Sequence, residues 1–297
     1  MRLNKNMLRR KRKIRNGYLF AMPFLIIFAM FFIYPFISGV IISFQNADGE
    51  FVWFENYVKI LASDDFTYKE DFFRGLGHTL LFVVISVPCL IIVPLFLALL
   101  LEIKPKGYKI FRGILFMPTI FSISSVILMW KQVLQVETGF INSIFLSLGW
   151  NQIDFLGSQP WAWISILFVT VWWTMGVNMV ILGAGLKNID KSVYEAAQID
   201  GANYFKSVWH ITIPLLKNQI FVVLIMTILA SFNIYGQAQL LTAGGPEQST
   251  KVLLMVILEH LYKRPHIAAA MSLLLGLIMI AISLLTMLPN RSKKERA

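Results

Sequence analysis

Cysteine, histidine and acidic residues are scarce in this chain. It has one cysteine, four histidines and 16 Asp or Glu residues among its 297 residues. The single cysteine, Cys89, excludes an intrachain disulfide and a cysteine metal cluster, so we expect it to be an inert packing residue. The histidines are scattered and show no His-Glu-x-x-His spacing, which argues against a membrane-embedded enzyme with a clustered metal or acid–base site.

Charge is also sparse, because charged residues make up 14% of the chain and hydrophobic residues 57%. A soluble domain has about 25% charged residues. Six apolar stretches reach the roughly 20 residues that a bilayer-spanning helix needs, and only the third contains a charge, Lys131. The predicted spans are residues 18–44, 79–101, 113–134, 161–186, 220–241 and 267–288. Prolines inside them, among them Pro88, Pro94 and Pro118, are expected to kink the helices without ending them.

The predicted fold is therefore an all-α integral membrane protein with six transmembrane helices. We expect one transmembrane domain, residues 18–290, between a basic tail at residues 1–17 and a second tail at residues 291–297. The first apolar stretch is too long for a cleaved signal peptide and lacks a small-residue cleavage site, so we interpret it as an uncleaved helix.

Lys and Arg are distributed unevenly between the two sides of the predicted membrane domain. The two tails and the segments 102–112 and 187–217 carry 20 of them, whereas the three alternate segments carry 7. Cytoplasmic loops retain the positive charge, so both termini are predicted to be cytoplasmic. The net charge of +11 owes much to a basic run between Arg2 and Arg15. Its place before a span favours contact with anionic membrane lipid over nucleic acid.

The segment between the fourth and fifth spans is unusual. It reads Glu-Ala-Ala-Gln-Ile-Asp-Gly-Ala at 195–202 and Ile-Thr-Ile-Pro-Leu-Leu at 211–216. Local explanations exist, since Ser192 and Glu195 have the spacing of a capping box, Gly201 suits a helix stop, and Pro214 suits the first turn before the next span. They leave unexplained an exposed pair of small residues, Ala196 and Ala197, which would permit close approach of another protein.

These elements, at this spacing, resemble the EAA loop of the transmembrane subunits of bacterial ABC importers. The resemblance implies a type I importer fold with a helix-turn-helix coupling loop at residues 187–217. Val208 and Asn218 depart from the usual aromatic residue and proline. The residues that the resemblance implies for contact with the ATPase are Glu195, Ala196, Ala197, Asp200 and Gly201.

No Gly-x-x-x-x-Gly-Lys-Ser/Thr phosphate loop occurs in the sequence. We therefore expect this chain to hold no cofactor and no catalytic residue, and ATP and Mg²⁺ to be bound by two separate ATP-binding subunits.

A second motif follows the fifth span: Leu-Thr-Ala-Gly-Gly-Pro at 241–246, then Ser249 and Thr250. Taken alone, the Gly-Gly-Pro sequence is typical of a tight turn. It looks like a signature of carbohydrate importers related to the maltose and glycerol-3-phosphate permeases. Residues 51–57, where Trp53 replaces a usual glycine, and the region 116–142 agree, so the resemblance covers about residues 18–288. It implies a second homologous permease subunit and an extracytoplasmic solute-binding protein that meets Gly244, Gly245 and Pro246.

Polar residues inside the spans are candidates for the substrate pathway, because they are costly in a bilayer. In the fifth span, the i, i+4 and i+8 spacing of Thr227, Ser231 and Tyr235 predicts that they share one helical face, with Asn233 and Gln237 in a neighbouring stripe. The fourth span offers an aromatic platform and hydrogen-bonding groups at Trp173, Thr174 and Asn178. Interhelical hydrogen bonding is the alternative for each of them. The resemblance places sugar contacts on these parts of both helices, but it expects amides where this chain has Ser231 and Ile234.

The function predicted from these observations is translocation of a sugar or oligosaccharide across a bacterial cell membrane. The permease would work by alternating access, driven by ATP hydrolysis in the separate subunits. An ABC importer of another polar solute, such as glycerol phosphate or a peptide-like compound, is the nearest alternative, although a phosphate would favour basic residues deep in the spans. An ion-driven secondary transporter would need an ionisable group inside a span, and no Asp, Glu or His stands in the middle of one.

Overall fold

The computed structural model describes residues 17–62 and 66–291, and this part of the chain is helical without β-strands. Four helices are long and apolar enough to cross a membrane, and two further candidates are pairs of helices that meet at a sharp bend. The four are Gly17–Ser43, Thr67–Glu102, Trp161–Lys187 and Pro265–Met287; the pairs are Tyr108–Ile120 with Ile123–Val133 and Tyr204–Leu215 with Lys217–Phe232. The predicted all-α membrane fold is confirmed, with six spans when each pair counts as one. Apart from residues 17 and 291, the predicted tails lie outside the described residues.

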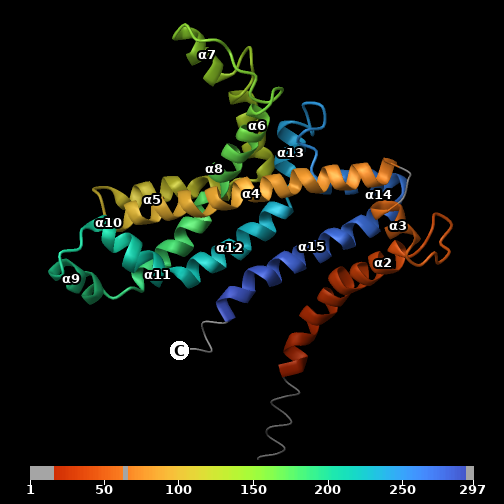
Figure 1. The fold of residues 1–297 in the computed structure, drawn as a ribbon, viewed down its shortest axis with the longest axis horizontal. Helices are drawn as coiled ribbons and strands as arrows, with labels where there is room; N and C mark the ends of the chain where they lie inside the picture. Colours follow the sequence, from red (N-terminus) through yellow and green to blue (C-terminus); the bar gives the residue numbers. More distant parts are fainter. Residues whose placement is uncertain (1–16, 63–65, 292–297) are drawn as a thin grey trace, which may run out of the picture.

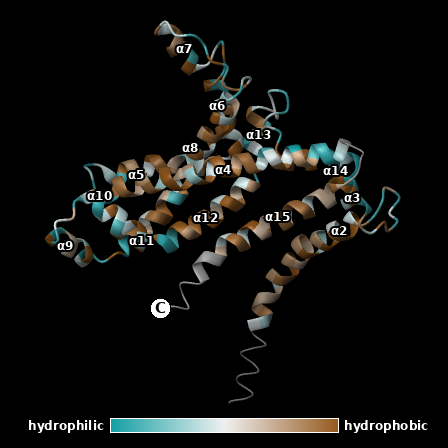
Figure 2. Ribbon diagram, in the orientation of Figure 1, coloured by the Kyte–Doolittle hydropathy of each residue, from teal (hydrophilic) through white to brown (hydrophobic). Residues whose placement is uncertain are grey.

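The long helix α4 (Phe66–Glu102) lies at the centre and packs on α8 (Trp161–Lys187), α12 (Lys217–Phe232) and α14 (Leu253–Lys263). Loops lie at two opposite ends of the bundle, and others lie beside α7 and α13 (Figure 1). One end holds α3 (Glu55–Leu61) and α14, and the other holds α9 (Lys191–Ile199) and α10 (Tyr204–Ser207). Figure 2 shows hydrophobic residues along the long helices and hydrophilic ones gathered towards these ends, as expected for a bundle that crosses a bilayer.

The first helix leans away from the bundle for most of its length. It includes η1 (Ala29–Ile33) and α2 (Tyr34–Ser43), and every residue from 17 to 37 is exposed within this chain. Only its far end is fixed: α2 packs on α15 (Pro265–Arg291), the Ser43 and Tyr57 hydroxyls are 2.7 Å apart, and Asn56 Nδ2 donates to the Ser43 carbonyl at 2.9 Å. The free part is an apolar surface for lipid or for another subunit.

Helix α4 begins at Phe66, well before the predicted start of the second span at residue 79. The extension carries Lys69, Glu70 and Arg74. Because the prediction counted only uncharged apolar residues, it placed the start of this helix too late in the sequence. An i,i+4 ion pair between Glu70 and Arg74 supports the exposed extension. Pro88 and Pro94 lie inside α4 without ending it, as predicted.

The third span is not the straight helix predicted at residues 113–134. It consists of α5 (Tyr108–Phe116), η2 (Met117–Ile120) and α6 (Ile123–Val133), with a bend of 102°. Pro118 lies in η2, so here the helix does end nearby. Ser122 caps α6 by accepting the Ser125 N–H at 3.3 Å. Beyond the bend, α6 and α7 (Phe140–Ser147) stand out from the bundle (Figure 1).

The fifth span is also shorter than predicted. Helix α12 ends at Phe232, the next three residues are not helical, and α13 (Gly236–Leu241) follows. At its other end α12 meets α10, η3 (Val208–Thr212) and α11 (Ile213–Leu215) at a 69° bend. The segment predicted as the outer loop 242–266 contains α14, which was missed because it is too short for a span.

We predict that the close approach of α8 to the third span depends on Gly176. A Cβ atom there would lie 2.8 Å from Phe116 Cα and 2.9 Å from the Leu115 carbonyl oxygen, both backbone atoms. Gly176→Ala should lower the free energy of unfolding by about 1–3 kcal/mol, as overpacked sites do. Gly183→Ala, on the same helix, is the matched control because its Cβ would meet nothing within 4 Å. Equal melting temperatures of the two variants in detergent would contradict this prediction.

Candidate functional sites

The loop between the fourth and fifth spans begins with a capped helix, but the cap differs from the predicted one. Asp190 is the N-cap of α9, and its Oδ1 accepts the Ser192 backbone N–H at 3.1 Å. This bond, together with one from the Ser192 side chain, lowers the pKa of the Asp190 carboxyl group. The predicted capping box of Ser192 and Glu195 is therefore wrong by two residues. Glu195 is exposed, and no hydrogen bond or ion pair within the described residues includes its side chain.

Gly201 ends α9 in the left-handed conformation, with φ of +75°. The Gly201 N–H donates to the Gln198 carbonyl at 3.0 Å and the Ala202 N–H to the Ala197 carbonyl at 2.9 Å, which is the Schellman arrangement. Asn203 then caps α10 by accepting the Lys206 N–H at 2.9 Å. The predicted pair of short helices that meet at Gly201 is present.

The surface of this loop is more apolar than predicted. Ala196 is exposed, but Ala197 is only 8% exposed, so the expected exposed alanine pair is wrong for its second member. Two large side chains were missed: Ile199 is 87% exposed and Phe205 73% exposed. Their signal in the sequence is a bulky apolar residue on each side of Asp200-Gly201 in a polar loop. We call Ala196, Ile199 and Phe205 the docking face; exposed apolar surface of this kind marks protein contacts.

The inner side of the loop is tied together by a polar contact. The Tyr194 hydroxyl of α9 and the Thr212 Oγ1 of η3 are 3.0 Å apart, and Thr212 also donates to the Ser207 carbonyl at 3.3 Å. Ser207 and Thr212 are buried. These bonds connect the two arms of the loop to each other.

The candidates on the fourth span make interhelical or local bonds. Asn178 is buried, and its Nδ2 donates at 2.8 Å to the Leu90 carbonyl on α4. Leu90 lies four residues before Pro94, which has no N–H to offer that carbonyl. Trp173 Nε1 donates at 3.1 Å to the Phe121 carbonyl at the bend of the third span. Thr174 donates to the Thr170 carbonyl of its own helix at 2.7 Å.

The fifth-span candidates do not share one helical face, because the helix ends before Tyr235. Thr227 and Ser231 are buried; Thr227 donates to the Val223 carbonyl at 2.8 Å, and the Ser231 hydroxyl is 2.9 Å from that of Ser86. Beyond the helix end, Asn233 is exposed, and Tyr235 and Gln237 are half-buried. No hydrogen bond within the described residues uses the side chain of Tyr235 or Gln237, so these groups are available to a ligand.

The outer Gly-Gly-Pro loop is closed by its own hydrogen bonds. Thr250 is fully buried; its Oγ1 donates to the Gly245 carbonyl at 2.7 Å and lies 2.7 Å from Thr242 Oγ1. Gly244 adopts a φ of +85°. Ser249 Oγ accepts a bond of 2.7 Å from Gln159, which joins the loop to the start of α8.

The exposed part of this loop is its tip. Gly244 is buried, and Gly245 and Pro246 are half-buried, whereas Ala243, Glu247 and Gln248 are exposed. The predicted motif residues thus build the loop, and the neighbouring tip presents the surface that another protein can reach.

Comparison with known proteins gives consistent matches. The family described as "Binding-protein-dependent transport system inner membrane component" matches residues 59–291. The arabinooligosaccharides transport system permease protein AraP of Bacillus subtilis is 31% identical over 91% of this chain and 87% of its own length. The multiple sugar-binding transport system permease protein MsmF of Streptococcus mutans is 31% identical over 92% and 96%. A bacterial ABC transporter that imports the acidic polysaccharide alginate shares the fold, with a TM-score of 0.82 and 23% identity over 98% of this chain and 99% of that one.

We predict that Asn178 stabilises α4 by satisfying the carbonyl that Pro94 frees. Asn178→Ala should lower the free energy of unfolding by about 1 kcal/mol, the size of interhelical hydrogen bonds in membranes. In a Pro94→Ala background the new N–H of residue 94 bonds that carbonyl, so Asn178→Ala should cost distinctly less. Denaturant unfolding of the wild type and the three variants in detergent forms the test. Equal costs in both backgrounds would exclude this role.

Proposed function

Because the chain belongs to the family of inner-membrane components of binding-protein-dependent transport systems, we propose that it is the permease subunit of an ABC importer for an oligosaccharide or a related sugar. It is a membrane transport subunit and not an enzyme. The sugar assignment draws on AraP and MsmF, whose names concern arabinooligosaccharides and multiple sugars and whose sequences align with nearly all of this chain.

The docking face is the part of this chain that meets the ATP-binding subunits. Ile199 and Phe205 lie on either side of Gly201 and are exposed, while a hydrogen bond on the inner side of the loop joins its two arms to each other. Apolar anchors of this kind supply most of the binding energy of protein interfaces. Glu195, unpaired and exposed on the same helix, is available to an ATPase residue. The two ATP-binding subunits hold ATP and Mg²⁺, and their closure moves the loop.

The substrate passes between this chain and a second homologous permease. Support comes from the break between α12 and α13, where the side chains of Tyr235 and Gln237 form no hydrogen bond within the described residues, and where Asn233 is exposed with its amide nitrogen bonded to the Leu229 carbonyl. Trp173, which is half-buried, belongs to the same cluster of side chains as Tyr235 and supplies an aromatic face. Thr227, Ser231 and Asn178 serve the packing of the bundle instead.

The orientation follows from the charge distribution. Both termini and the docking face are cytoplasmic, in a bacterial plasma membrane. The tip at Glu247 and Gln248 faces outward, where a solute-binding protein delivers the sugar.

If the substrate passes at the break between α12 and α13, substitutions of Tyr235 and Ser231 should have different effects. Tyr235→Phe removes a hydroxyl that is free for the sugar, so the KM of uptake should rise roughly threefold to tenfold, with little change in melting temperature. Ser231→Ala breaks the pair with Ser86 and should lower the melting temperature with the KM unchanged. Uptake of radiolabelled sugar by reconstituted importer measures the first quantity. The opposite pattern would exclude the helix break as the pathway.

The docking face is tested by Ile199→Glu. A carboxylate in an apolar contact must be desolvated without a partner, so ATP-driven uptake and co-purification of the ATPase should fall by roughly thirtyfold, the loss typical of an interface hot spot. Asn188→Glu adds the same charge at another exposed residue of the same cytoplasmic segment and is the control. Should both variants retain full uptake, Ile199 is not a docking residue.

A further inference from the structure

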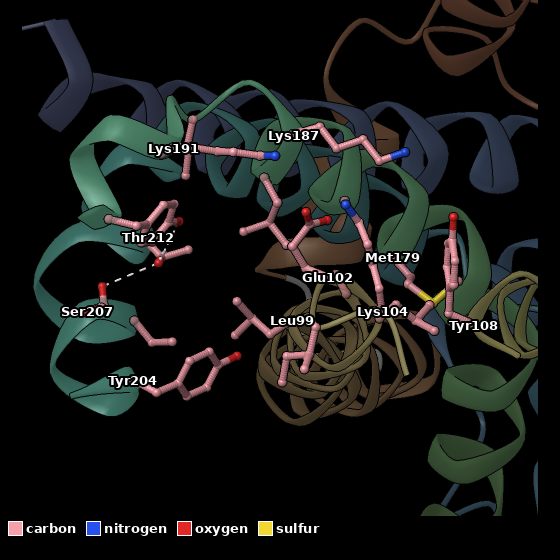
Figure 3. A pocket seen from close by; sticks show the side chains of 18 of the residues that line it. Leu99, Glu102, Lys104, Tyr108, Met179, Lys187, Lys191, Tyr204, Ser207 and Thr212 are labelled. Atoms are coloured by element: carbon pink, nitrogen blue, oxygen red, sulfur yellow. Dashed lines mark hydrogen bonds between the residues drawn. The ribbon is translucent and has the colours of Figure 1, made fainter. Parts of the chain in front are cut away.

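A cavity of about 670 Å³ lies between the bundle and the inner side of the loop at residues 187–217, which carries the docking face and is called the docking loop below. Its walls come from the last turns of α4 and α8, the start of α5, and the segment from α9 to η3 (Figure 3). It is separate from the break between α12 and α13 and from the docking face, since neither Ile199 nor Tyr235 lines it. The proposed transport cycle leaves this cavity without a role.

The lining is strongly cationic. Lys104, Arg112, Lys187 and Lys191 border the cavity, against one carboxylate, Glu102. No ion pair within the described residues includes any of the four cations. Figure 3 shows Lys187 and Lys191 on one side of the cavity, with Leu99 and Tyr204 on the other. Four unpaired cations around one hollow repel one another, and an anion at that side would relieve the repulsion.

The wall formed by α4 and α8 is apolar and lies at the ends of two membrane spans, whereas the docking loop adds polar side chains such as Gln198, Ser207 and Thr212. This wall includes Leu99 and Leu101 of α4 and Met179 and Leu186 of α8. These residues lie within a few helical turns of the basic residues that border the cavity. A ligand that fits this wall needs hydrocarbon next to its negative charge. At the end of a membrane span, hydrocarbon and anionic groups meet in the lipids themselves, because the acyl chains end at the headgroup layer.

We propose that this cavity binds the phosphate headgroup of an anionic phospholipid, with the first part of its acyl chains against the leucines. A free phosphate compound would meet the cations but would leave the apolar wall uncovered. The lipid contacts both parts that must move together in transport: Arg112 and Lys187 belong to the bundle, and Lys191 belongs to α9 of the docking loop. Anionic lipid at this position joins the docking loop to the bundle.

The experiment uses the assembled importer, purified in a mild detergent and exposed to phosphatidylglycerol or phosphatidylcholine. Native mass spectrometry counts the lipids retained by each complex. The double variant Arg112→Gln/Lys187→Gln should bind phosphatidylglycerol roughly thirtyfold more weakly, from about a fivefold loss for each basic residue. The matched control is Lys106→Gln/Lys109→Gln, which removes the same amount of charge. Both lysines are exposed, lie between α4 and the first turns of α5, and do not line the cavity. It should bind within twofold of the wild type.

Several outcomes would overturn the proposal. Equal retention of phosphatidylcholine would mean that the site does not select for charge, and an equal loss in the control would mean that the surface alone attracts the lipid. Displacement of phosphatidylglycerol by soluble glycerol phosphate would identify a free phosphate as the ligand. Retention by the permease without its ATPase, but not by the full complex, would assign the cavity to the protein interface. The measurement needs no transport, so it stands apart from any failure of the sugar assignment, and equal melting temperatures of both double variants exclude misfolding as the cause.

Discussion

The structure depends on one constraint of the bilayer: each backbone carbonyl that a break or a proline frees inside a span must find a donor within the protein. Two such carbonyls are satisfied from α8. Leu90, freed by Pro94, receives Asn178, and Phe121, at the bend of the third span, receives the Trp173 indole. These bonds connect α4, α8 and the bent span to one another. The central helices are thus connected by bonds to irregular backbone in addition to the packing of apolar side chains.

This constraint also sorts the polar side chains of the spans by role. Asn178, Thr227 and Ser231 are buried, and each bonds a backbone carbonyl or a neighbouring hydroxyl, so these residues serve the packing of the bundle. A break in the helix creates the opposite situation. Where α12 ends, the side chains of Tyr235 and Gln237 are half-buried and form no hydrogen bond with the part of the chain that the structure describes. Both groups are polar residues inside predicted spans, so the sequence alone cannot distinguish them. Only the structure separates the residues that serve packing from those whose side chains are available to a sugar.

Composition was sufficient to predict the membrane fold, because a run of about 20 apolar residues has few other uses. The two bends could not be predicted in this way, because they depend on contacts between residues far apart in the sequence. One such contact is the bond from Trp173 to the Phe121 carbonyl, and hydropathy does not reveal it. The charged extension of α4 was missed for a related reason, since its helix is stabilised outside the bilayer by ion pairing and packing. In the docking loop the turn at Gly201 was predictable from its local chemistry. The cap was not, because Asp190 competes with Ser192 for the same role.

In the proposed function, the docking loop passes motion from a soluble ATPase to helices in the membrane. Its two arms are joined firmly to each other, but less of the loop is in contact with the bundle. Within the loop, the Schellman turn at Gly201 and the contact between Tyr194 and Thr212 fix the angle between its arms. Towards the bundle, much of its inner side faces a hollow lined with cations. The loop already reaches the bundle through its two chain ends, where Ile189 and Leu216 pack with residues of α8 and α12, so a ligand in the hollow would add a further connection. If anionic lipid fills it, the strength of coupling becomes a property of the membrane's charge as well as of the protein, which a packed apolar junction in the same place would not allow.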